Sequence, residues 1–152
     1  MKTRVVTSVE LPCPIEEAWA VLVAWERQAG WLLDADRVQV VSSAREGVGV
    51  RLAVRTRLFG VPAFTEPIEV TGWEPPHRLT IRHGDPVAGE GAWELAAVPG
   101  GTRFTWTEEV ELAVPVLGGA AGRIYAPLLR VLMRRALAGL RASVIASGPD
   151  RR

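Results

Sequence analysis

Residues 116–147 read VLGGAAGRIYAPLLRVLMRRALAGLRASVIAS, and this stretch decides the fold. Apolar side chains recur in it at helical spacing, namely Leu129, Met133, Ala136, Leu137, Leu140 and Val144, with Tyr125 and Leu132 at their flank. Arginines cluster to one side of this row, so the pattern predicts one long amphipathic helix. A helix of about 30 residues spans about 45 Å. Its apolar stripe therefore needs a large apolar surface to lie on.

The preceding residues supply that surface as strands. Polar and apolar side chains alternate over residues 3–11, 37–43, 47–58, 63–73, 78–83, 92–97 and 103–110. This period is typical of half-buried strands, and the short turns between them require antiparallel pairing. After the first strand, Pro14 begins a short helix, and Gly30 interrupts its continuation into a second helix or turn. We predict an α+β fold in which an antiparallel sheet of about seven strands and the long helix enclose a cavity.

The composition is that of one soluble globular domain. Of the 152 residues, 48% are hydrophobic and 23% are charged, and the formal net charge is +1. This charge gives no reason to expect a nucleic acid or an anionic membrane as a partner. No apolar run reaches the roughly 18 residues of a membrane span, and the first residues lack the apolar centre of a signal peptide. We expect a cytoplasmic domain over residues 1–147, a short tail at 148–152 and no stable membrane insertion.

The sequence offers little for metal or cofactor chemistry. His77 and His83 are the only histidines, and Cys13 is the only cysteine. A single cysteine forms neither an internal disulfide nor a CxxC metal site. No HExxH, phosphate-binding loop or GxSxG motif occurs. We therefore expect no metal and no cofactor.

Several stretches of the chain resemble one known superfamily. They are PCPIEEAWAVLVAWERQAGWL (12–32), VTGWEPPHRLTIR (70–82), GGTRFTWTEEVEL (100–112) and the terminal helix. They resemble the START-like helix-grip superfamily, in particular its polyketide cyclase/dehydrase (SRPBCC) type. The resemblance implies a curved antiparallel sheet that grips the long helix, with a deep cavity between them. Members of this superfamily bind lipids, sterols, polyketides, quinones or plant hormones, and some are cyclases or aromatases. They share no catalytic motif, so the resemblance transfers no catalytic residue.

Three polar residues interrupt the apolar rows assigned to the concave face: Glu66, His83 and Glu108. A carboxyl group buried against apolar walls has a raised pKa, which suits general acid or base catalysis. His83 is its potential partner. Two interpretations are open. In the first, these side chains face the cavity. In the second, strand ends and β-bulges turn them to solvent, or an arginine pairs with them.

Aromatic residues form the second group of candidate ligand contacts. Tyr125, the only tyrosine, lies near the start of the helix, where its hydroxyl reaches either a ligand or water. Of the six tryptophans, Trp31 and Trp93 are predicted to contact a ligand or to guard an entrance. Trp19 and Trp106 are instead assigned to the core.

The terminal helix also carries a group of basic residues without an acidic neighbour in sequence. They are Arg123, Arg130, Arg134, Arg135 and Arg141. They either form a solvated face balanced by acids of the sheet or let the helix lie on a membrane surface as part of a lipid carrier.

Two main functional hypotheses follow. The first is binding of a hydrophobic or amphipathic small molecule, which is lipid-, polyketide- or quinone-like. The second is a polyketide cyclase, aromatase or dehydratase that uses cavity carboxylates or His83 as acid and base. Whether the protein is an enzyme, and which oligomeric state it adopts, are open from the sequence. The predicted ligand contacts in both cases are Glu66, His83, Glu108, Tyr125, Trp31 and Trp93.

Overall fold

The computed structural model describes residues 2–58, 60–112 and 118–148. In chain order the elements are β1 (Thr3–Leu11), α1 (Ile15–Leu22), the 3-10 helix η1 (Trp25–Gly30), β2 (Ala35–Val40), β3 (Arg51–Leu58), β4 (Val61–Glu74), β5 (Arg78–His83), β6 (Val87–Val98), β7 (Gly101–Leu112) and α2 (Gly118–Ser147). The strands form one seven-stranded sheet in the order β1-β7-β6-β5-β4-β3-β2. Every neighbouring pair is antiparallel. The predicted α+β class and the predicted sheet are confirmed.

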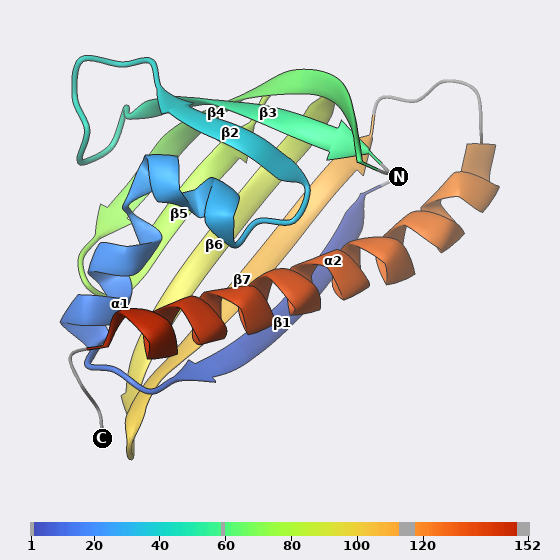
Figure 1. Ribbon diagram of the computed structural model, residues 1–152. Coiled ribbons are helices and arrows are strands. Elements are labelled where there is room, and N and C mark those ends of the chain that lie inside the picture. Colours follow the sequence, from blue (N-terminus) through green and yellow to red (C-terminus); the bar gives the residue numbers. More distant parts are fainter. Residues whose placement is uncertain (1, 59, 113–117, 149–152) are drawn as a thin grey trace.

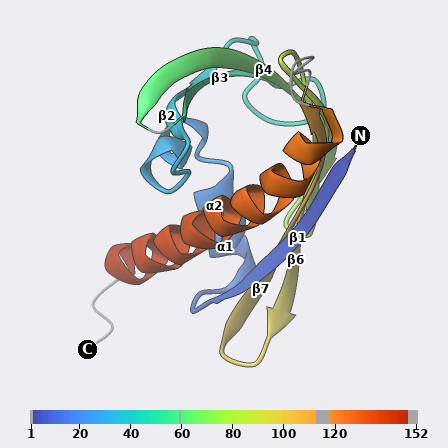
Figure 2. The ribbon, with the colours of Figure 1, turned by 90° about the vertical axis from the view of Figure 1, so that its right-hand side faces the viewer.

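The long helix α2 lies across the concave face of the curved sheet (Figure 1). In the view turned by 90°, β3 and β4 arch over the helix, and β1, β6 and β7 stand beside it (Figure 2). The side chains that α2 buries are those whose spacing predicted its stripe, namely Met133, Ala136, Leu137, Leu140 and Val144. Leu129 is partly buried and packs against the same core. The sheet and the helix thus form two layers, and each covers the apolar face of the other, as the sequence predicted.

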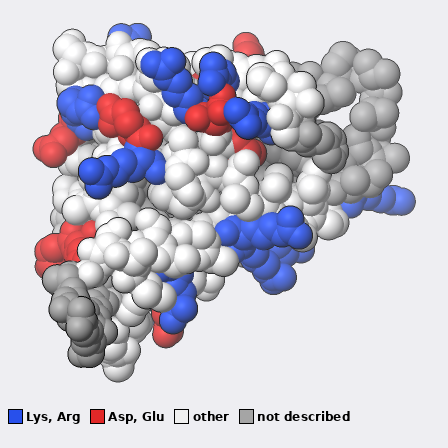
Figure 3. All heavy atoms as spheres, in the orientation of Figure 1, with Lys and Arg blue, Asp and Glu red and all other residues white. Residues whose placement is uncertain are grey.

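The opposite side of α2 is basic. Arg123, Arg130, Arg134, Arg135 and Arg141 are all exposed. Basic side chains gather over the middle of α2 in the space-filling view (Figure 3). None of these arginines forms an ion pair within the described part of the chain, so the balancing contacts expected from acids of the sheet are not made. Neither α1 nor α2 is long and apolar enough to cross a membrane.

The strand predicted over residues 47–58 begins only at Arg51. Gly47 and Gly49 have φ angles of 92° and 96°, a left-handed conformation that breaks the extended backbone. The alternation over residues 47–58 predicts that Val48 shares a face with Val50, but Val48 is 66% exposed, whereas Val50 is fully buried. The prediction for Val48 was wrong because periodicity alone does not reveal where a glycine pair turns the chain.

Candidate functional site

A cavity of about 400 Å³ lies between the concave face of the sheet, η1 and α2. Its walls are mostly apolar and aromatic and include Val54, Phe64, Ile68, Trp93, Leu132 and Met133. Ionisable side chains also line it, namely Asp34, Glu66, His83, Glu108 and Tyr125. The cavity thus combines a large apolar wall with a few polar side chains.

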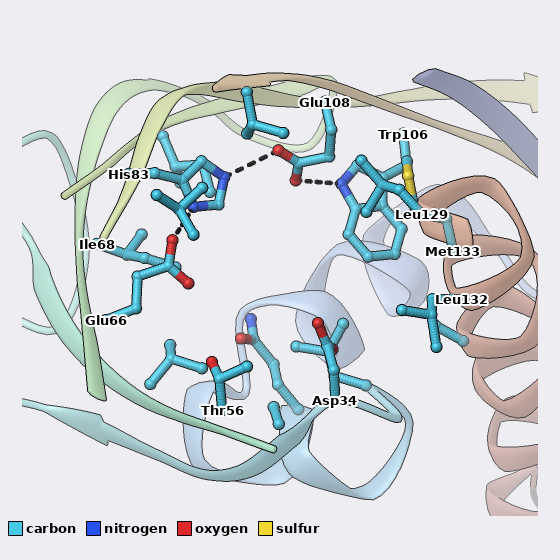
Figure 4. Close-up of a pocket in the computed structure, with 18 of the residues that line it drawn as sticks. Asp34, Thr56, Glu66, Ile68, His83, Trp106, Glu108, Leu129, Leu132 and Met133 are labelled. Carbon is cyan, nitrogen blue, oxygen red and sulfur yellow. Dashed lines mark hydrogen bonds and ion pairs between the residues drawn. The ribbon is translucent and has the colours of Figure 1, made fainter. Parts of the chain in front are cut away.

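The three polar residues singled out from the strand pattern meet in one hydrogen-bonded network (Figure 4). The Nδ1 atom of His83 bonds to Oε1 of Glu66, and its Nε2 atom lies 2.8 Å from Oε2 of Glu108. The indole N–H of Trp106 donates to the other oxygen of Glu108 at 2.6 Å. The side chains of His83, Glu66 and Glu108 are 11%, 9% and 7% exposed. The interpretation that these residues turn to solvent or pair with arginines is therefore wrong.

The sheet register explains how residues from separate strands meet. His83 on β5 pairs with Gly89 on β6, and Glu108 on β7 pairs with Gly91 on β6. The strands β5 and β7 lie about 10 Å apart, because neighbouring strands are separated by about 4.8 Å. Since β6 presents only glycines at these two positions, His83 reaches Glu108 across an intervening strand. A Cβ atom on Gly91 would lie 3.0 Å from Oε1 of Glu108.

No β-bulge disturbs these positions. The irregularities of register fall between Ala35 and Arg37, between Thr56 and Arg57, and between Val70 and Gly72. The pairings of β5 with β6 and of β6 with β7 run without a shift. The strict alternation of the sequence therefore holds at the site.

The network fixes the charge of His83. Burial by itself would lower the pKa of the imidazole, but hydrogen bonds to Glu108 and Glu66, together with their negative charges, raise its pKa from 6.5 to about 10. The ring is thus an imidazolium at neutral pH, with both N–H groups donated to carboxylates. In this state it has no free nitrogen with which to accept a proton.

Asp34 is a member of the site that the sequence reasoning missed. It lies just before β2, where its carbonyl oxygen accepts a hydrogen bond from the backbone N–H of Arg57 at 2.7 Å. Its carboxyl group points into the cavity (Figure 4). Burial raises the pKa of Asp34, and the negative charges of Glu66 and Glu108 raise it further. No periodic pattern marks this position, because it lies in a turn.

Thr56, on β3, is a second residue that the sequence reasoning did not assign to the site. It is 7% exposed, it lines the cavity and its hydroxyl points inward (Figure 4). No hydrogen bond to this hydroxyl is formed within the described part of the chain. A buried threonine in an apolar row was the available signal.

The predicted aromatic contacts divide into two groups. Tyr125 and Trp93 line the cavity, and burial raises the pKa of the Tyr125 hydroxyl to about 12, helped by the charges of Glu108, Asp34 and Glu66. Trp31 does not line the cavity, so its prediction was wrong. It packs behind Trp93 and Trp106, with ring centroids 5.9 and 6.3 Å away. Trp106, assigned to the core, is buried but also faces the cavity.

The described residues contain no group of three or more His, Cys, Asp or Glu side chains arranged to hold a metal ion. At the site itself, Glu66 and Glu108 direct one oxygen each at the imidazole of His83 rather than converging on a common point. The polar region therefore offers hydrogen-bonding and acid–base groups.

Comparison with known proteins agrees with this architecture. The model of the family described as polyketide cyclase / dehydrase and lipid transport matches residues 2–144. An uncharacterized protein of Mycobacterium tuberculosis is 30% identical over 142 residues, which cover 88% of this chain and 80% of that protein. An uncharacterized protein of Mycobacterium bovis gives the same values.

Solved structures share the fold. The protein TTHA0849 from Thermus thermophilus has a TM-score of 0.78 at 24% identity, over 98% of this chain and 100% of that one. A START superfamily protein from Mycobacterium smegmatis has a TM-score of 0.69 at 15% identity, over 95% and 99% of the two chains. The di-domain ARO/CYC BexL from the BE-7585A biosynthetic pathway has a TM-score of 0.77 at 17% identity, over 97% of this chain but 51% of that one. This chain belongs to the polyketide cyclase / dehydrase and lipid transport family.

Proposed function

We propose that this protein binds a hydrophobic or amphipathic small molecule, with a lipid-, polyketide- or quinone-like skeleton, between the sheet and α2. The observation that carries the proposal is the cavity of about 400 Å³ with apolar walls and a few polar side chains. Small-molecule sites have this composition, because apolar burial supplies affinity and a few polar groups fix orientation. Burial of ligand surface contributes roughly 25 cal/mol per Å². The family description, which includes lipid transport, supports the same reading.

Binding is testable with the uncharged fluorophore N-phenyl-1-naphthylamine, whose emission rises in apolar surroundings. We expect saturable enhancement with the wild-type protein. The variant Ile68→Trp should remove it, because Ile68 lines the cavity and a larger ring there fills the space. The matched control is Ile145→Trp, because Ile145 lies on α2 but is 49% exposed. Its enhancement should equal that of the wild type.

Two results would overturn the proposal. One is the absence of saturable enhancement, and the other is equal enhancement by Ile68→Trp in a form that unfolds as cooperatively as the wild type. Native mass spectrometry of protein purified from its own host then identifies the bound molecule by its mass.

A second candidate function, proton transfer to or from the bound molecule, is favoured by the position of Asp34. Its carboxyl group points into the apolar cavity, and burial raises its pKa. Carboxyl groups in such surroundings serve as general acids or bases. His83 is less suited to this work, since both of its nitrogens are committed to carboxylates. The cyclase-type alternative thus centres on Asp34 and Glu66.

The chemical competence of Asp34 can be measured without knowledge of the substrate. The probe 5-nitrobenzisoxazole loses its C–H proton to a base, its N–O bond breaks, and a cyanophenolate forms. We expect a rate above that of free carboxylate, lost in Asp34→Asn and retained in Glu69→Gln, whose carboxylate is on the outer face of β4. An unchanged rate in Asp34→Asn would remove Asp34 from this role.

A further inference from the structure

One carboxylate oxygen in the cavity is an acceptor that no described protein group uses. Glu66 uses Oε1 for His83, whereas its Oε2 has no hydrogen-bond partner in the described part of the chain and points into the cavity (Figure 4). Glu66 is only 7% exposed and lines the cavity, so this oxygen opens to the cavity and not to the outer surface. The carboxyl group of Asp34 faces it from the other side of the cavity, with the Thr56 hydroxyl nearby (Figure 4). A ligand that fills the cavity displaces water from these oxygens, so these positions favour a ligand that offers them hydrogen bonds of its own.

The cavity also lacks a positive charge that a ligand could use. Every described arginine and lysine side chain is exposed, and none lines the cavity. The one cationic group among the lining residues is His83, and both of its N–H groups are already donated to Glu66 and Glu108. Three carboxyl groups, those of Asp34, Glu66 and Glu108, thus face one imidazolium. An anionic ligand head in this region would be buried beside like charges without a partner.

Resting on the proposed function, we infer that the ligand carries an uncharged or cationic hydrogen-bond donor, best a protonated amine, which lies between Asp34 and Glu66 while its apolar body fills the cavity. A primary ammonium group offers three donors and no acceptor, as a lysine side chain does. It can therefore donate to Oε2 of Glu66, to the carboxyl group of Asp34 or to the Thr56 hydroxyl. Its positive charge also offsets the excess of carboxyl groups over the imidazolium.

The test uses three probes with the same tail and different heads: decylamine, decanol and decanoate, each below its micelle concentration at pH 7.5. Isothermal titration calorimetry gives their dissociation constants. We expect decylamine to bind about tenfold more tightly than decanol, since its ammonium adds a charge on the donor side of each hydrogen bond to a carboxylate, and tenfold corresponds to about 1.4 kcal/mol. Decanoate should bind more weakly than decanol.

Variants assign the preference to named groups. Glu66→Gln and Asp34→Asn should each reduce the ratio of decylamine to decanol affinity toward one, because the neutral amide keeps an acceptor oxygen but removes the charge that favours the ammonium. The matched control Glu69→Gln removes an exposed carboxylate from the same strand as Glu66 and should keep the full preference.

Each outcome bears on a defined claim. If decanol binds and decylamine binds no more tightly, or decanoate binds as well as decylamine, the inference about the head group is wrong and the small-molecule function stands. An undiminished preference in both Glu66→Gln and Asp34→Asn would also overturn it. If no probe binds and N-phenyl-1-naphthylamine shows no enhancement, the proposed function itself fails.

Discussion

The Nε2 atom of His83 lies 2.8 Å from Oε2 of Glu108, although β6 separates the strands that carry the two residues. Glu108 also accepts the indole N–H of Trp106, so its removal leaves two buried donors without a partner. We expect Glu108→Ala to lower the free energy of unfolding by about 3–5 kcal/mol, the cost of breaking a buried ion pair. Urea denaturation followed by circular dichroism measures the change.

The adjacent residue offers the control for this substitution. Glu109 lies on the outer face of β7, is 45% exposed and pairs with Lys2 at 3.6 Å. Exposed ion pairs contribute about 0–1 kcal/mol, so Glu109→Ala should change stability little. Equal losses from the two substitutions would show that the network of His83 and Glu108 adds nothing to stability.

The charge of His83 predicts a specific pH dependence. Its pKa is about 10 in the folded state against 6.5 as the reference, so the folded protein holds this proton more tightly than the unfolded chain. The resulting stabilisation is complete below pH 6.5 and is lost as the pH rises through about 10. The difference in unfolding free energy between wild type and His83→Gln should therefore shrink over this range.

Nitrogen NMR checks the same charge directly. At pH 7.5 the ring of His83 should show two protonated nitrogens, and the variant His77→Gln leaves His83 as the only histidine and so assigns the signal. A neutral ring at this pH would contradict the charged network.

We expect the carboxyl group of Asp34 to lower the free energy of unfolding at neutral and higher pH. Its folded-state pKa is raised by burial and by the charges of Glu66 and Glu108, so its contribution to stability is greatest at low pH and is lost as the pH rises through that pKa. We expect Asp34→Asn to stabilise the protein at pH 8 by roughly 0.5–2 kcal/mol, as substitutions at strained functional sites do. The gain should diminish as the pH falls. A loss of stability at pH 8 would instead indicate that the carboxylate forms a favourable contact.

Gly91 makes the space in which the carboxylate of Glu108 lies. A methyl group there would lie 3.0 Å from Oε1 of Glu108 and 3.0 Å from the side chain of Ile81. We expect Gly91→Ala to displace the carboxylate and lower the NMR-measured pKa of His83. The control is Gly30→Ala, since a Cβ atom at Gly30 meets nothing within 4 Å. An unchanged pKa in Gly91→Ala would show that the network adapts without loss.

The fold was predictable because half-buried helices and strands place apolar residues at regular intervals in the sequence. Each strand faces the helix on one side and solvent on the other, so the alternation of β7 identified Phe104, Trp106 and Glu108 as one inward row. The same alternation placed Glu66 and His83 on the concave face. Long, regularly half-buried elements record their orientation in this way.

The remaining parts of the site are not periodic. Asp34 is positioned by a hydrogen bond from the N–H of Arg57 to its carbonyl oxygen. Arg57 lies 23 residues further along the chain, so no local sequence pattern reveals this contact. His83 reaches Glu108 across β6 because Gly89 and Gly91 have no side chains. The Gly-Glu-Gly sequence does not reveal this role until the strand register shows that these glycines pair with His83 and Glu108. Trp31 was misplaced because the sequence does not distinguish a ring that faces a cavity from one that supports such a ring.

The separation of basic and acidic side chains has a kinetic consequence. Of the 16 acidic residues that the structure describes, three line the cavity, so 13 remain elsewhere against 16 described basic residues. Among these residues, an approaching amine thus meets an excess of three positive charges outside the cavity before it enters an interior of opposite sign. Added salt should quicken its arrival by weakening this outer repulsion, while its departure, governed by contacts shielded from the solution, should hardly respond.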